Sequence, residues 1–143
     1  MAYIEQADLL TRMTSEELVQ TTNDAGGDTV DTDVLDGILS EVDAIVDAHV
    51  GVRYSAPVES PSQFLKNQCL SIVVFKLMNR RGMAPEHVER NYDDAMKILD
   101  KIAKGQIAFA DTALKQPASL RTTKDTVTGR EESVFDREKL KDF

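Results

Sequence analysis

The hydrophobic positions between residues 32 and 104 recur at helical spacing and predict three long helices. From Thr32 to Val52, apolar residues stand three or four positions apart and acidic residues fill much of the remainder, as in an amphipathic helix with one buried stripe. The segment from Pro61 to Arg81 is apolar over most of its circumference, so we expect it to be buried, either centrally or at a subunit interface. A third apolar stripe runs from Pro85 to Lys104.

Capping and turn residues set the limits of these helices. Gly82 and Gly105 stand where the second and third helices should end, as is common for glycine just past a helix C-terminus. Pro57 and Pro61 cannot continue the first helix. The candidate N-terminal caps are Asp31, Thr32 or Asp33 for the first helix and Ser60 or Ser62 for the second.

Two shorter helices are predicted nearer the N-terminus. The stretch from Ile4 to Arg12 is sparsely apolar, and Thr14-Ser-Glu-Glu17 forms a capping box that should open a helix running to about Thr21. The loop that follows, NDAGGDTVDTD, has the spaced acids of a calcium loop. With Asp24 placed first, however, Thr29 stands where such a loop needs glycine, and the closing glutamate is also missing. A solvated turn fits better.

The composition changes after residue 110. Residues 111–133 are mostly polar, with few large apolar side chains, and the chain then ends in SVFDREKLKDF. Burying the four apolar side chains of that ending would contribute roughly 6–10 kcal/mol. Ordering its backbone would cost roughly 1–2 kcal/mol per residue. We therefore expect this segment to become ordered only on a ready-made surface.

These patterns predict an all-α protein in two parts. Residues 1–110 form a helical bundle with two to three long helices, in which residues 106–110 are a short extended piece. Residues 111–143 form an extended C-terminal arm, in which the β-branched stretch LRTTKDTVTG would make short β pairing only against another surface.

Charge is distributed unevenly along the chain, whose net charge is −8. Residues 1–60 hold 13 acidic and 2 basic residues, whereas residues 61–110 carry a small positive excess. The acids either solvate helix faces or form one flank of a polar subunit that meets a neighbour's basic flank in a head-to-tail ring. An acidic first half argues against sequence-specific DNA binding.

Candidate chemistry is sparse. His49, Cys69 and His87 lie on three different predicted helices without a metal-ligand spacing. Cys69 sits in an apolar run and is expected to be a buried thiol. The sequence shows no nucleophile or phosphate-binding motif, no signal peptide and no membrane span. We predict no enzyme, no cofactor and no metal site, in a soluble intracellular product.

The order of several short motifs carries a family resemblance. The chain opens with M-A-Y and continues with E-E-L-V-Q-T-T-N-D, G-V-R-Y-x-x-P-V, N-Y-D-D-A-M-K-I-L, I-A-K-G-Q-I and finally V-F-D-R-E-K-L-K-D-F. In this order they resemble the small neck proteins of Mu-like bacteriophages and prophages, which are head–tail connector components. The most specific pieces are Arg53-Tyr54 with Pro57, Ile102 to Gly105, and Phe135 to Phe143. We expect Pro57 to turn the chain and Tyr54 to pack its ring while its hydroxyl finds a partner.

The resemblance implies a virion protein of the neck, made in the bacterial host cytoplasm. It would form a ring of twelve copies under the portal, contacting the portal and downstream neck or tail proteins but no membrane. DNA would pass through without specific binding. The arm would then bind the portal or a neighbouring copy through apolar anchors and a polar rim: Val134, Phe135, Leu140 and Phe143 as anchors, Arg137 and Lys139 as rim. The acidic residues that would line or face the channel are Asp36, Glu41, Asp43 and Asp47.

Three alternatives remain open at this point. The protein could occupy another neck station, such as a stopper or tail-completion protein, or it could be a small dimeric helical regulator. The arm could also be disordered or fold back on its own body.

Overall fold

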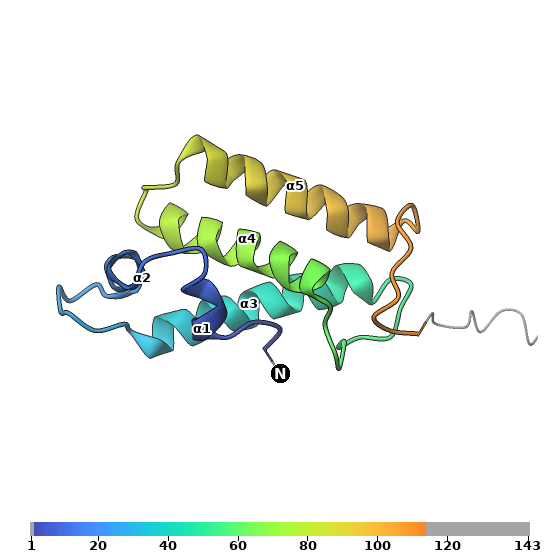
Figure 1. Ribbon diagram of the computed structural model, residues 1–143, viewed down its shortest axis with the longest axis horizontal. Coiled ribbons are helices and arrows are strands. Elements are labelled where there is room, and N and C mark those ends of the chain that lie inside the picture. Colours follow the sequence, from blue (N-terminus) through green and yellow to red (C-terminus); the bar gives the residue numbers. More distant parts are fainter. Residues whose placement is uncertain (1, 114–143) are drawn as a thin grey trace, which may run out of the picture.

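The computed structural model of the protein describes residues 2–113, which fold as a helical bundle (Figure 1). Its helices are α1 (Gln6–Leu9), α2 (Ser15–Thr22), α3 (Thr32–Val50), α4 (Gln63–Arg80) and α5 (Glu86–Ala103). Within residues 2–113 there is no strand, so the all-α prediction is confirmed for the body. The predicted arm and its β pairing fall on residues that, from 114 onward, lie outside the described part.

Helix α4 forms the centre of the bundle. It packs against α3 and α5 along its length and also contacts α1 and α2. Its apolar circumference is therefore covered mainly by other parts of the same chain, which confirms the predicted burial and, of its two alternatives, favours the central one. The buried residues of α4 are Leu65, Cys69, Leu70, Ile72, Val73, Val74 and Leu77. On its outer side, Phe75 stacks on Tyr92 of α5 with ring centroids 4.2 Å apart.

The predicted N-terminal caps are confirmed for three helices. The Thr14 hydroxyl accepts a hydrogen bond from the Glu17 amide at 3.2 Å, and the Glu17 carboxylate accepts one from the Thr14 amide at 2.9 Å. Asp31 is the cap of α3 and accepts from two backbone amides of its first turn. The hydroxyl of Ser62 caps α4 by accepting from the Leu65 amide at 3.2 Å. Each cap satisfies an amide that has no partner inside its helix.

Three helix limits differ from the prediction. Helix α1 covers only Gln6–Leu9. It begins at a capping box between Glu5 and Asp8, and it ends where the Thr11 and Arg12 amides bond carbonyls three residues back, as in a turn. Helix α3 ends at Val50, where the chain enters a turn. Pro85 caps α5 instead of occupying its first turn.

Two glycines end helices as predicted. Gly82 and Gly105 follow α4 and α5 with φ of +67° and +74°, a left-handed conformation that side chains disfavour. After Gly105 the predicted extended piece at 106–110 forms no strand, and its Phe109 is buried in the core. No helix in residues 2–113 is both long and apolar enough to cross a membrane.

Candidate functional site

Two parts of the family-like motifs meet where α5 ends. The guanidinium of Arg53, in the turn after α3, lies so close to Gly105 that a Cβ there would clash with it. Glycine is favoured at position 105 by its positive φ, whereas the flexible Arg53 side chain could move away from a Cβ there. The motifs around Arg53 and Gly105 therefore share one structural junction between α3 and α5.

Tyr54 lies at the same end of the bundle. Its ring packs edge-on against Phe109 with centroids 5.4 Å apart and an angle of 79° between the ring planes. Its hydroxyl accepts a hydrogen bond from the Phe109 amide at 3.3 Å. The predicted role of Tyr54 is confirmed, and the contact fixes the chain that leaves α5. Pro57 stands in the α3–α4 loop, which also confirms the predicted turn.

Tyr3 joins the N-terminal segment to α3 and to the α3–α4 loop. Its hydroxyl donates to the carboxylate of Asp47 and accepts from the Val58 amide at 2.9 Å. Its own amide donates to Asp43 at 3.1 Å. Burial and the hydrogen bond to Asp47 raise the pKa of Tyr3 well above its ordinary value. These hydrogen bonds connect the opening M-A-Y motif with the P-V pair of the motif G-V-R-Y-x-x-P-V.

The first residues of the predicted arm are bonded to the α3–α4 loop. The carboxylate of Asp111 accepts from the Ser62 amide at 2.8 Å. The Thr112 hydroxyl donates to the Ser55 carbonyl at 2.9 Å, and the Ser55 amide donates to the Ala113 carbonyl at 2.9 Å. We call residues 111–113 the arm root. The chain thus leaves the body at a defined place, while the predicted domain boundary at residue 110 stays a prediction.

The four acidic residues predicted to face a channel occupy different environments on α3. Asp43 and Asp47 are half-buried and bonded to Tyr3, and burial is the main cause that raises the pKa of Asp43. Glu41 pairs with Lys76 of α4 at 2.7 Å. Asp36 is exposed. The structure therefore brings Asp43 and Asp47 together under the N-terminal segment and leaves Asp36 and Glu41 toward solvent.

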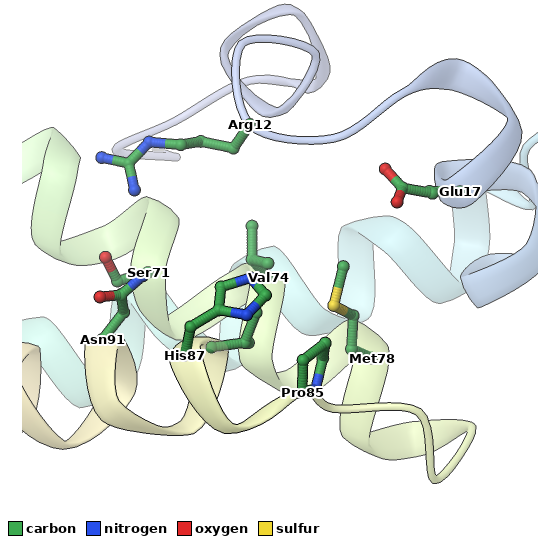
Figure 2. A pocket seen from close by; sticks show the side chains of 9 residues that line it. Arg12, Glu17, Ser71, Val74, Met78, Pro85, His87 and Asn91 are labelled. Carbon is green, nitrogen blue, oxygen red and sulfur yellow. The ribbon is translucent and has the colours of Figure 1, made fainter.

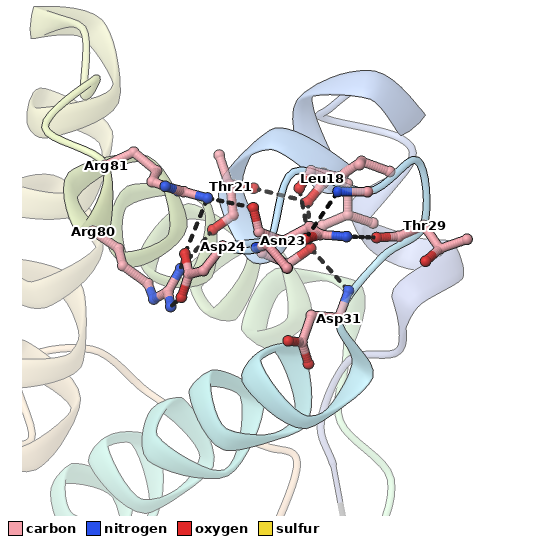
Figure 3. Close-up of polar contacts among 12 residues, drawn as sticks. Leu18, Thr21, Asn23, Asp24, Thr29, Asp31, Arg80 and Arg81 are labelled. Atoms are coloured by element: carbon pink, nitrogen blue, oxygen red, sulfur yellow. Dashed lines mark hydrogen bonds and ion pairs between the residues drawn. The ribbon is translucent and has the colours of Figure 1, made fainter.

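Two arginines at the end of α4 bind the acidic loop before α3 (Figure 3). Arg80 binds both carboxylate oxygens of Asp24, Arg81 lies 3.0 Å from the same carboxylate, and both arginines also bond backbone carbonyls at the end of α2. Asn23 folds the loop on itself by donating to the Thr29 carbonyl at 2.8 Å and accepting from the Ala25 amide. Asp24 is therefore the structural partner of Arg80 and Arg81. The sequence did not reveal this contact, since only the fold brings residues 24 and 80 together.

We expect Asp24→Asn to loosen this loop. Amide hydrogen exchange at Ala25 and Gly27, whose amides bond the Asn23 side chain, should become roughly two- to fivefold faster, the size of effect typical of an exposed ion pair. Asp28→Asn is the matched control, because Asp28 lies in the same loop and makes no ion pair within the described residues.

The pH dependence provides a second check on Asp24. The hydrogen bond from Arg80 lowers the pKa of Asp24, so its contribution is present above the unfolded pKa of about 4 and is lost as the pH falls through the lower folded value. The difference in exchange between wild type and Asp24→Asn should therefore vanish in acid. A difference that persisted there would contradict the ion pair.

A groove runs between the N-terminal helices and the α4–α5 turn (Figure 2). Its larger hollow, of about 270 Å³, has Arg12 and Glu17 on one wall and His87 and Asn91 on the other, over a floor that includes Val74 and Met78. A second hollow of about 220 Å³ shares Glu17, Met78 and Pro85 with the first and adds Gln20, Thr21 and Met83. We call the two together the α2–α5 groove. Sequence reasoning did not find it, because its walls come from four separate segments.

The titratable residues singled out from the sequence do not form a reactive centre. Cys69 is fully buried, and burial raises the pKa of its thiol to about 12, so the nucleophilic thiolate is disfavoured. His49 is half-buried and its ring bonds the Ile45 carbonyl, whereas His87 is exposed. Within residues 2–113 no three His, Cys, Asp or Glu side chains are grouped as metal ligands.

The predicted partner-binding residues of the arm lie outside the described part of the chain. They are Val134, Phe135, Arg137, Lys139, Leu140 and Phe143. What the structure adds is the place from which they depart, since the arm root is held next to Ser55 and Ser62.

Comparison with known proteins identifies the family. Residues 3–127 match the family model described as Bacteriophage Mu, Gp36. A similar protein is the Mu-like prophage FluMu protein gp36 of Haemophilus influenzae, 23% identical over 136 residues, which cover 92% of this chain and 95% of that protein. The resemblance to Mu-like phage proteins is confirmed by both matches. Because the family model spans most of the sequence, the chain belongs to the bacteriophage Mu Gp36 family.

Proposed function

We propose that this protein is a head–tail connector, an adaptor that forms a ring between the portal and the tail and lets DNA pass. The observation that carries the proposal is membership of a Mu phage family over nearly the whole chain. A helical body without a grouped reactive centre among its described residues suits an assembly role better than a chemical one.

The arm root supports this role. Three hydrogen bonds hold residues 111–113 on the α3–α4 loop, so each copy in a ring would project its C-terminal segment from the same place. The anchors Val134, Phe135, Leu140 and Phe143 would then bind the portal or a neighbouring copy. Many such weak contacts in one ring act together, so the ring as a whole can bind about 10²–10⁴-fold more tightly than a single contact does.

The acidic residues fit a DNA channel only in part. Asp43 and Asp47 accept hydrogen bonds from Tyr3, so in this proposal they stabilise the fold and do not face DNA. Asp36 and the solvent-exposed Glu41 are the two that would face the channel. The charge of Glu41 is offset by Lys76, so the negative charge of Asp36 is the one that would repel the phosphate backbone and keep DNA from adhering while it passes.

Mixing the purified full-length protein with its portal ring tests the proposal. Native mass spectrometry should find a ring of copies bound to the portal, whereas deletion of residues 131–143 should weaken that binding at least about tenfold through lost avidity. A second variant keeps the length and charge of the arm and replaces only its apolar anchors, Val134, Phe135, Leu140 and Phe143, with serine. It should weaken portal binding as much as the deletion does.

Two outcomes would contradict parts of this proposal. Portal binding unchanged by the deletion would remove the anchor role of the arm. A dimer that ignores the portal ring would exclude the connector and favour the small dimeric regulator, while binding to tail proteins alone would favour a stopper or tail-completion protein.

A further inference from the structure

The α2–α5 groove consists of two adjoining hollows with apolar walls. They measure about 270 and 220 Å³, and a further hollow of about 520 Å³ lies beyond Met83. Val74, Met78 and Val88 provide apolar contact along it, and Met83 at its end has 51% of its surface exposed. An exposed methionine beside a hollow is an adaptable surface for apolar side chains.

The groove carries charges of both signs. Arg12 and Glu17 line the larger hollow. Arg81 lies with Met83 in an adjoining hollow beyond it, where it is already paired with Asp24. An occupant that fits should therefore combine a few apolar side chains with closely interleaved acidic and basic residues. The segment 134–143 has this composition, since VFDREKLKDF places three acidic and three basic residues among four apolar ones.

The position of the arm root shows which grooves the segment can reach. Figure 1 shows that α4 begins at the end of the bundle where α5 ends and the arm root lies, and that it runs toward α2 and the α4–α5 turn. The groove lies near that far end, about 24 Å along α4 from Ser62. The twenty residues 114–133 can extend to about 66 Å, which is ample to reach the groove of the same copy or to cross to another copy. A head-to-tail ring needs two different surfaces that fit each other, and the arm and the groove form such a pair.

We propose that the α2–α5 groove of each copy binds the C-terminal segment 134–143 of the neighbouring copy in the ring. This inference rests on the proposed ring and assigns the arm to a neighbouring copy instead of the portal. The apolar side chains of the segment enter the two hollows, and its charged residues pair with Arg12 and Glu17 at the rim.

Disulfide trapping between two full-length variants tests this inference. One variant carries His87→Cys in the groove and the other carries Lys141→Cys beside Leu140, so the anchors and the buried Cys69 stay unchanged. When the two are mixed and assembled on portal rings under mild oxidation, a heterodimer joined by a disulfide should form. Lys97→Cys on the same helix is the matched control, because its side chain is 71% exposed and lies outside the groove. It should yield at least tenfold less heterodimer.

Two further variants separate the alternatives. Met83→Glu places a charge at an exposed position of the groove. It should abolish the disulfide between the cysteines introduced at positions 87 and 141 without unfolding the body. A single chain carrying both cysteines should cross-link less within the ring as wild-type copies are added. A cross-link that forms within one chain and persists on dilution would overturn the inference in favour of folding back. Rings that bind the portal without this cross-link would also overturn it and leave the connector role intact.

Discussion

Replacing Leu77 with alanine should lower the free energy of unfolding by about 2–5 kcal/mol, the range for a large apolar side chain removed from a core. Leu77 is fully buried on α4, the helix that every other helix contacts. The loss combines the apolar surface no longer buried with the cavity that remains. For a domain of this size, the melting temperature should fall by about 10 °C.

Phe64→Ala is the matched control on the same helix. Phe64 keeps 43% of its surface exposed, so its removal loses only part of the roughly 1.5–3 kcal/mol of a fully buried side chain and should lower stability by about 1–2 kcal/mol. Urea denaturation of both variants measures the difference. If Phe64→Ala were as destabilising as Leu77→Ala in the isolated protein, α4 would not be the centre of this bundle.

Much of the fold follows from local sequence rules. Thr14, Asp31 and Ser62 were identified as caps or among the candidate caps, because a short polar side chain before an apolar run satisfies free helix amides wherever it occurs. The glycine after α5 was predicted for the same kind of reason, since positive φ is a local requirement. The burial of α4 followed from apolar residues around most of its circumference, whereas its central place became evident only from its contacts with the other helices.

The interactions that the sequence did not reveal all join distant residues. Asp24 meets Arg80 across 56 positions, and Tyr3 meets Val58 across 55. No local pattern marks such partners, because charge and hydroxyl groups on a helix face are normally just solvated. The acidic stripe of α3 shows the consequence. Charge alone suggested one continuous face, whereas the N-terminal segment covers Asp43 and Asp47 and leaves Asp36 exposed.

Replacing Tyr3 with phenylalanine should lower the free energy of unfolding by about 1–3 kcal/mol. The variant keeps the ring in the core but removes the hydroxyl, which leaves the Val58 amide and the half-buried carboxylate of Asp47 without that partner. Unpaired polar groups away from water cost more than the lost bond itself contributes. Tyr92→Phe is the matched control, since the Tyr92 hydroxyl makes no hydrogen bond within the described residues. It should be nearly neutral by urea denaturation.

The advantage of wild type over Tyr3→Phe should shrink as the pH rises above about 10. Burial, reinforced by the bond to Asp47, raises the pKa of Tyr3 in the folded state, whereas the unfolded chain releases this proton near its ordinary value of about 10. The stabilisation is therefore complete below that pH and declines as the pH rises toward the folded pKa, by at most about 1.4 kcal/mol per pH unit. Lysines titrate in the same range, but equally in both proteins, so they cancel in the difference. Urea denaturation of both proteins at pH 8, 10 and 11 measures it. A difference that stayed constant across this range would mean that the Tyr3 hydroxyl is not held between Asp47 and Val58, and the N-terminal segment would then need another means of attachment to α3.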